Sequence, residues 1–308
     1  MPINSNIFII IMQTKYDIIF LVIHMEVKFI EPQGYCNGVK RAINLIKEAI
    51  NDPTVKRPIY LLGPIIHNKY ANLELTNLGV ILLDNKTRLD MLDEIESGSV
   101  VISAHGVSQN VYQKALDKGL NIIDTTCPYV NLIHKNVLSH LSDYKILYVG
   151  TKNHPECEGI LDLDKNITLI TSPNDLENID ICEDKIYVTC QTTLSHSFVD
   201  EIYFKIKQKY PQAIFDEKIC SATTQRQNAV INQEKVDLCI VVGDKTSSNS
   251  KKLVEVCENQ AKIKAYLVEN KNDINDDWLI GVNSVSITSG ASTPDFITQE
   301  VITYLKEK

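Results

Sequence analysis

Three cysteines stand in matching settings along the chain, and their spacing limits the folds that it can adopt. Cys36, Cys127 and Cys220 lie 91 and 93 residues apart. Each closes a short strand-like run and a polar turn, in the stretches VKFIEPQGYC, NIIDTTC and AIFDEKIC, and a segment with helical periodicity follows. The pattern predicts one α/β unit repeated three times, with a thiol at the carboxyl end of a strand in each copy. Open parallel sheets place their binding sites at that end.

Other polar residues repeat in the same way, each between an apolar run and a helical segment. Every predicted unit has two such positions besides its cysteine, so that nine strand–turn–helix segments fall into three sets of three. The residues at these positions are His67 and His105 in the first unit, His154, Glu156, Thr192 and Thr193 in the second, and Ser247, Ser248, Asn249 and Ser292 in the third.

The apolar runs between the turns predict the fold class. Runs such as IYLL, VVIS, ILYV and CIVV are short and apolar throughout, which is typical of strands covered by helices on both faces. Strands that alternate with helical segments indicate parallel sheets joined by right-handed crossovers. We therefore expect an α/β protein of three pseudo-threefold-related units with parallel sheets, at residues 26–118, 119–210 and 211–308.

The composition excludes one class of partner. Of the 308 residues 44% are hydrophobic and 23% are charged, as in ordinary globular proteins. The formal net charge is −8 at pH 7, and nucleic-acid-binding proteins normally present a basic surface. We therefore expect no nucleic-acid partner.

Residues 1–25 precede the repeat and lack its pattern. Their two apolar patches are interrupted by the stretch QTKYD, whereas a membrane span needs about 20 mostly apolar residues. The basic start and cleavage site of a signal peptide are also missing. We expect an extension that is disordered or not translated, with translation beginning at Met25, and no membrane partner. A degenerate targeting or membrane-surface segment is the alternative.

Three thiols at equivalent strand ends suggest a metal cofactor. If the units close around a pseudo-threefold axis, the three thiolates converge. Iron–sulfur clusters usually take four thiolates, so a [4Fe–4S] cluster held by three would leave one iron open to a substrate oxygen. Two alternatives remain: a zinc ion held by three thiolates, and three unrelated buried cysteines. The other five cysteines follow no repeat, and a reducing, cytoplasmic compartment fits this cysteine usage best.

The remaining repeated residues suggest an anion pocket and a proton source. Histidines and hydroxyls at helix N-termini favour phosphate groups, because backbone N–H groups and the helix dipole attract negative charge. A carboxyl group near a buried site, here Glu156, can be tuned to deliver a proton. Each residue also has a simpler explanation: a surface glutamate for Glu156, a helix start for Thr192 and Thr193, and helix capping for Ser247 and Ser292.

Several stretches, in order, resemble one family from about Val27 to the C-terminus. They are GYCNGVKRAI, GPIIHNKY, SAHGVSQ, DTTCPYV, HPECEG, QTTLS, ICSATTQRQ, SSNS and GASTPD. The family is hydroxymethylbutenyl diphosphate reductase, which completes the methylerythritol phosphate route to isoprenoids. The resemblance implies a central [4Fe–4S] cluster on Cys36, Cys127 and Cys220. It implies substrate binding by His67, His105, His154, Thr192, Ser247, Ser248, Asn249 and Ser292, and catalysis by Glu156 and Thr192.

The implied reaction is a two-electron reductive dehydroxylation of 4-hydroxy-3-methylbut-2-enyl diphosphate to isopentenyl and dimethylallyl diphosphate. The implied partners are this diphosphate and an electron donor such as ferredoxin or flavodoxin. Two alternatives remain. A hydro-lyase would use the same three-thiolate cluster without net electron transfer, and an iron–sulfur sensor would catalyse nothing.

Overall fold

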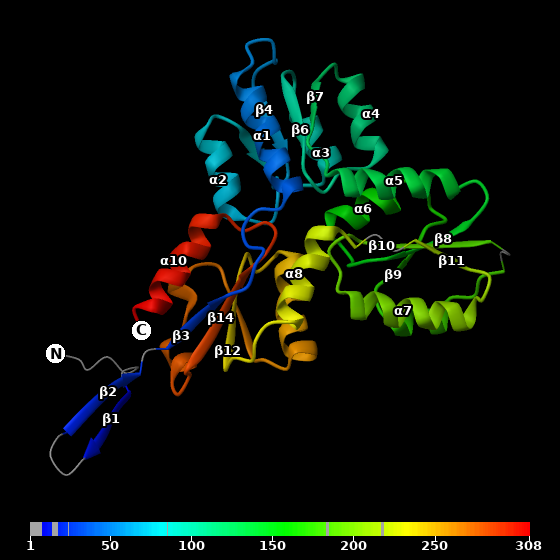
Figure 1. The fold of residues 1–308 in the computed structure, drawn as a ribbon. Helices are drawn as coiled ribbons and strands as arrows, with labels where there is room; N and C mark the ends of the chain where they lie inside the picture. The colour runs from blue at the N-terminus through cyan, green and yellow to red at the C-terminus, as the bar shows by residue number, and fades with distance from the viewer. Residues whose placement is uncertain (1–7, 14–17, 24, 85, 183–184, 217–218) are drawn as a thin grey trace. The chain divides into compact units, whose positions relative to one another are not determined.

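The chain forms three four-stranded sheets whose strands are all parallel, together with a short hairpin near the N-terminus (Figure 1). The computed structural model describes residues 8–13, 18–23, 25–84, 86–182, 185–216 and 219–308. The three parallel sheets with helices confirm the predicted α/β fold class.

The first sheet contains four strands in the order β5-β4-β6-β7. Its strands are β4 (Ile59–Leu62), β5 (Ile81–Leu83), β6 (Ser99–Ile102) and β7 (Asn121–Asp124). The helices along this stretch are α1 (Asn37–Asn51), α2 (Lys69–Asn77), α3 (Arg88–Asp93) and α4 (Gln109–Asp117).

The second sheet repeats that arrangement in the order β11-β10-β8-β9. Its strands are β8 (Lys145–Val149), β9 (Thr168–Ile170), β10 (Ile186–Cys190) and β11 (Ile214–Asp216). The accompanying helices are α5 (Pro128–His140), α6 (Pro155–Leu161), the 3₁₀ helix η1 (Pro173–Asn178) and α7 (His196–Lys209).

The third sheet has the order β13-β12-β14-β3. Its strands are β12 (Leu238–Val242), β13 (Ala265–Val268), β14 (Ser284–Ser289) and β3 (Glu26–Phe29). The remaining helical segments are α8 (Ser221–Ile231), α9 (Ser248–Val256), the π-helix η2 (Cys257–Ala261), the 3₁₀ helices η3 (Lys271–Asp273) and η4 (Asp276–Leu279), and α10 (Asp295–Lys306).

Each sheet takes its last strand from the point where the sequence repeat starts again. The strands that precede Cys127 and Cys220, β7 and β11, lie at an edge of the first and second sheets, and β3, which precedes Cys36, lies at an edge of the third. The repeat boundaries expected near residues 118 and 210 therefore fall just before β7 and β11, which pair with the strands that precede them in the chain. As divisions into domains, they stay a prediction.

By its internal contacts the chain divides into two compact units, Met1–Tyr35 with Gln225–Lys308 and Cys36–Thr224. The unit Cys36–Thr224 contains the first two sheets and all three repeated cysteines, and the other unit contains the third sheet. Because apolar side chains stabilise the fold by leaving water, the sheets are covered on their faces. In the second sheet α7 packs on one face, and α5 and α6 pack on the other (Figure 1).

The segments after Cys36 and Cys127 form helices with one buried face, which confirms their predicted helical periodicity. The buried residues are Val39, Ala42, Ile43, Ile46 and Ala49 in α1, and Val130, Ile133 and Val137 in α5.

The segment before the repeat contains an antiparallel hairpin of β1 (Phe8–Gln13) and β2 (Ile18–Ile23). Residues 1–7, 14–17 and 24 lie outside the described residues, so the expected extension at 1–25 falls partly outside the structure. Its disorder and the start at Met25 stay predictions. Within the described residues, no helix combines the length and apolar character that a membrane crossing requires.

Candidate active site

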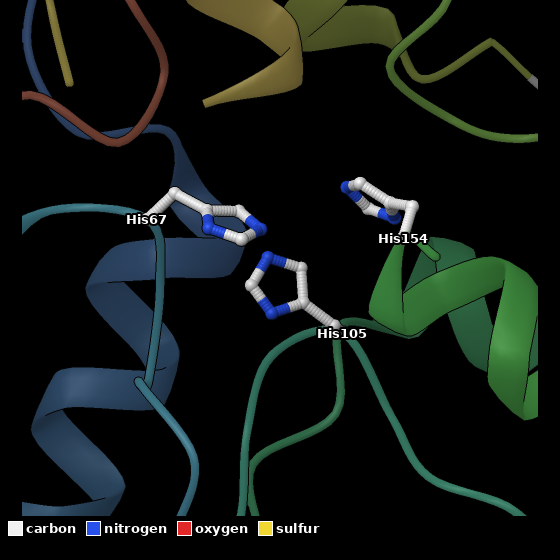
Figure 2. Close-up of side chains that lie close together, drawn as sticks. All are labelled: His67, His105 and His154. Carbon is white, nitrogen blue, oxygen red and sulfur yellow. The ribbon is translucent and has the colours of Figure 1, made fainter. Parts of the chain in front are cut away.

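Three histidine rings meet between the first and second sheets. His67 follows β4, His105 follows β6, and His154 follows β8 and caps α6. The centroid of the His67 ring lies 4.8 Å from that of His105 and 5.6 Å from that of His154, and the His105 and His154 centroids are 5.6 Å apart. Figure 2 shows the rings converging from three separate segments. Sequence analysis predicted these three residues, and the fold brings them together.

Burial keeps two of these rings neutral. Removal from water holds the pKa of His105 well below its usual value of 6.5, and the neighbouring His67, His154 and Arg88 act in the same direction. Burial, followed by His67 and Arg88, lowers the pKa of His154 to about 3. At neutral pH both rings therefore lack a charge, and each has one N–H donor and one acceptor nitrogen.

The hydrogen bonding of His154 decides what the cluster can bind. One nitrogen from each of the three rings lies within 4.8 Å of the others, which is a possible set of metal ligands. However, Nδ1 of His154 accepts a hydrogen bond of 3.2 Å from the backbone N–H of Glu156. The proton of neutral His154 must then lie on Nε2. Neither nitrogen offers a free lone pair to a metal, whereas an Nε2–H group suits an anionic oxygen.

A buried carboxyl group lies beside this cluster on the first turn of α6. Glu156 is only 2% exposed. Its Oε1 accepts a hydrogen bond from the backbone N–H of Thr192 at 2.8 Å, and its Oε2 accepts one from the Thr192 hydroxyl at 2.9 Å. The helix α7 begins only at His196, with Ser195 as its N-cap. Thr192 therefore does not start that helix, and both of its donors contact the carboxyl group.

Burial gives Glu156 a proton affinity suited to acid chemistry. Loss of hydration raises the pKa of its carboxyl from 4.5 to about 7, against the opposing effect of the hydrogen bonds from Thr192 and Tyr148. A group with such a pKa is protonated in about half of the molecules at neutral pH and can deliver a proton without a large energetic cost. The surface-glutamate explanation is excluded by this burial.

The three repeated cysteines stand at helix starts. Cys36 is the N-cap of α1, Cys127 is the N-cap of α5, and Cys220 directly precedes α8. A Cβ atom added at Gly38 would lie 2.9 Å from Sγ of Cys127 and 3.8 Å from Sγ of Cys36. The missing side chain of Gly38 thus lets the Cys127 sulfur lie close to the backbone of α1, near the thiol of Cys36.

The thiols influence one another without forming a site for a single ion. Burial raises the pKa of the Cys127 thiol, and Cys36 and Cys220 raise it further; burial also raises that of Cys220. Among the described residues, the side chains found close enough together to share one ion are the three histidines and not the three thiols.

The third sheet carries the remaining predicted residues in the other compact unit. Ser247 caps α9, and its Oγ lies 3.3 Å from that of Ser292. Asn249 is 5% exposed, and neither atom of its amide has a hydrogen-bond partner in the described part of the chain. Buried amides without partners are rare and point to an absent ligand. The alternative that Ser292 caps a helix is wrong, because α10 begins at Asp295 with Pro294 as its N-cap.

Sequence analysis missed two residues in or next to strands of the second sheet, Gln191 and Tyr148, which lie near Glu156 and Thr192. Gln191 is fully buried; its Oε1 accepts hydrogen bonds from the Thr151 N–H at 2.9 Å and the Cys157 thiol at 3.4 Å, while its Nε2 donates to Thr193 at 2.8 Å. Tyr148 donates a hydrogen bond of 3.4 Å to Oε1 of Glu156. A tyrosine within the otherwise aliphatic strand KILYV was the one available signal, since buried tyrosine hydroxyls need partners.

The chain is similar to known proteins over most of its length. A family model described as LytB protein matches residues 27–306. The chain is 45% identical over 286 residues to a protein from Bacillus cereus named 4-hydroxy-3-methylbut-2-enyl diphosphate reductase, covering 92% of this chain and 90% of the relative. A protein of the same name from Geobacillus thermodenitrificans is 43% identical with the same coverage.

Solved structures show the same likeness. One is titled as the E-1-hydroxy-2-methyl-but-2-enyl-4-diphosphate reductase from Plasmodium falciparum; it has a TM-score of 0.84 at 32% identity and covers 91% of this chain and 87% of that one. Another, titled as (E)-4-hydroxy-3-methyl-but-2-enyl diphosphate reductase, has a TM-score of 0.64 at 31% identity and covers 92% and 100%.

Proposed function

Because the chain belongs to the LytB protein family, we propose that it reduces 4-hydroxy-3-methylbut-2-enyl diphosphate to isopentenyl and dimethylallyl diphosphate. The reaction breaks the bond between carbon and the hydroxyl oxygen. Two electrons and two protons enter; one proton leaves with the hydroxyl as water, and the other ends on carbon. The observation that carries the proposal is the buried Glu156–Thr192 pair beside three converging histidines.

The histidines would hold the diphosphate as hydrogen-bond donors. His154 presents Nε2–H because its Nδ1 is engaged by the backbone. The Nδ1 of His105 is buried and has no partner within the described residues, so that it is available to a ligand. Ser247, Ser248, Asn249 and Ser292 would supply further donors, in line with the unpaired amide of Asn249.

Glu156 and Thr192 would handle the protons. The carboxyl is protonated in a substantial fraction of molecules near pH 7 because burial raises its pKa to about 7. The Thr192 hydroxyl lies 2.9 Å from Oε2 and can both accept and donate a hydrogen bond. A proton on Glu156 can therefore pass through Thr192 to a leaving hydroxyl, and the buried surroundings limit competing transfer from water.

Cys36, Cys127 and Cys220 would hold a [4Fe–4S] cluster, and the closeness of the Cys36 and Cys127 sulfurs to Gly38 supports that assignment. When bound, such a cluster supplies electrons and one iron without a protein ligand. Its electrons would come from a carrier such as ferredoxin or flavodoxin in the cytoplasm. This chain's residues would bind the diphosphate, orient the hydroxyl and move the protons.

Anaerobic purification followed by iron and sulfide analysis and a turnover assay tests the proposal. We expect iron and sulfide in near-equal amounts, and formation of both products only when a strong chemical reductant is present. Substitution of Cys182, an exposed free cysteine, by Ser serves as the matched control and should change neither result. Turnover without reductant would instead identify a hydro-lyase, and no turnover with a fully loaded cluster would reject the enzymatic proposal.

A further inference from the structure

We propose that Tyr148 is a positioning residue for the proton-transfer step, which holds the Glu156 carboxyl in place through its buried hydroxyl. The inference rests on the proposed function, in which Glu156 supplies protons. Among the described residues, the Tyr148 hydroxyl donates its hydrogen bond to Glu156 and not to a predicted thiol ligand or one of the three histidines, so its role would be exerted through Glu156.

The fold makes room for the Tyr148 ring at the end of β8. Tyr148 is fully buried and belongs to the core cluster between α5, α6 and the second sheet. Two residues further on, a Cβ atom at Gly150 would lie 3.0 Å from Cε1 of Tyr148 and 2.5 Å from Sγ of Cys157. Any side chain at position 150 would therefore push against both groups. The glycine lets the ring lie where its hydroxyl reaches the first turn of α6.

The hydroxyl completes the set of donors around Glu156. Thr192 binds both carboxyl oxygens from the loop after β10, at 2.8 and 2.9 Å. Tyr148 donates to Oε1 at 3.4 Å from a different strand. The carboxyl thus receives hydrogen bonds from residues of two strands or their loops. Rotation about its terminal bond would break the contacts with both Thr192 and Tyr148.

The tyrosine acts as a donor at every ordinary pH. Burial raises its pKa well above 10, and Glu156 raises it further. Its hydroxyl stabilises the carboxylate form of Glu156, opposing the effect of burial. The other titratable groups that face this pair are His154, Cys157 and Glu158 on α6, Cys190 at the end of β10 and Cys220 before α8.

Tyr148→Phe removes the hydroxyl and keeps the ring. Without that donor the carboxylate form of Glu156 loses support, so the pKa of Glu156 should rise, by roughly one unit for a bond of this length. The high-pH limb of turnover, where the acid is lost, should move upward by the same amount. A less well oriented carboxyl should also lower kcat by about tenfold while KM stays within about twofold, because the contact serves the transition state.

The experiment combines infrared titration of the protonated Glu156 carboxyl with pH profiles of turnover, both on the anaerobic, cluster-loaded protein. The Glu156→Gln variant identifies the carboxyl band by removing it. Tyr203→Phe is the matched control. Tyr203 lies on α7, and its hydroxyl also donates a hydrogen bond of 3.4 Å, to the backbone carbonyl of Asp216. Gly150→Ala provides a second way to weaken the contact, because its methyl group would press on the Tyr148 ring and on the Cys157 sulfur.

Upward shifts of the infrared titration and of the kinetic limb in Tyr148→Phe, with neither in Tyr203→Phe, would establish the role. An infrared titration that matches the parent, or a kcat within twofold of it, would overturn the inference. The two proposals fail separately: if Glu156→Gln turns over normally, the proposed proton source is wrong, and the infrared titration alone then decides whether Tyr148 holds the carboxyl.

Discussion

Substitution of Glu156 by Gln should abolish most activity while making the protein more stable at alkaline pH. Glutamine has nearly the same size and keeps the contacts with Thr192, because the threonine hydroxyl can reverse its hydrogen bond and accept from the new amide. It cannot deliver a proton. Loss of a general acid typically lowers the rate by about 10²–10⁴-fold. We expect a loss of that size in kcat, with little change in KM or in cluster content.

The stability effect follows from the raised pKa of Glu156. The folded protein holds this proton up to about pH 7, whereas the unfolded chain releases it near 4.5. The stabilisation due to the protonated carboxyl is complete below pH 4.5 and disappears as the pH rises through about 7. One pKa unit corresponds to about 1.4 kcal/mol, so burial of this carboxyl, ionised at pH 8 and protonated at pH 5, should cost about 3 kcal/mol at pH 8 and about 1 kcal/mol at pH 5. Glutamine is neutral throughout and avoids that cost.

Urea unfolding of parent and Glu156→Gln at pH 5 and pH 8, under anaerobic conditions, measures the difference directly. The variant's advantage in unfolding free energy should grow by about 2 kcal/mol between the two pH values. Glu158→Gln is the control for the loss of a carboxyl group from the same helix, because the side chain of Glu158 is 59% exposed. A Glu156→Gln protein with unchanged turnover, or with the same relative stability at both pH values, would refute the reasoning.

Three further predictions concern the cluster and the N-terminus. Replacement of any of the three predicted ligands by Ser should abolish the visible absorption of anaerobic protein, whereas Cys239→Ala, which empties a fully buried position, should lower the unfolding midpoint and leave the absorption intact. Gly38→Ala should reduce iron content measurably, because the added methyl group would lie 2.9 Å from the Cys127 sulfur; an unchanged iron content would contradict the proposed role of Gly38 beside the cluster. Deletion of residues 1–24 should leave kcat/KM unchanged, and a folded but inactive deletion variant would show that the segment belongs to the enzyme.

The sequence was sufficient to predict the architecture because its signals are local and repeated. Each site residue follows a short apolar strand, and the carboxyl ends of parallel strands meet at one edge of a sheet. His67 and His105 follow neighbouring strands of one sheet and could therefore be expected to converge. His154 follows a strand of the second sheet, and the fold brings all three ring centroids within 5.6 Å of each other.

What the sequence could not provide was the pairing of strands and the direction of hydrogen bonds. Pairing of β7 and β11 with the preceding sheets depends on contacts across the repeat boundary, which no local pattern records. The proton position on His154 depends on a backbone contact to its Nδ1. Tyr148 resembled an ordinary core residue because the hydroxyl partner that distinguishes it lies eight residues away on another element.

The shared strand order explains why the predicted site residues occupy some loops and not others. Within each group of four strands the order is second, first, third, fourth, so the second strand lies at the far edge, beside the first. In all three sheets the predicted residues follow the first, third and fourth strands. The loops after β5, β9 and β13, the far-edge strands, carry none. If the repeat served only to pack the sheets, the predicted residues would not be restricted to the loops after the first, third and fourth strands. The bias is expected if each sheet presents its functional groups at the carboxyl ends of the same three strands, with a thiol after the edge strand and proton-handling or anion-binding groups after the other two.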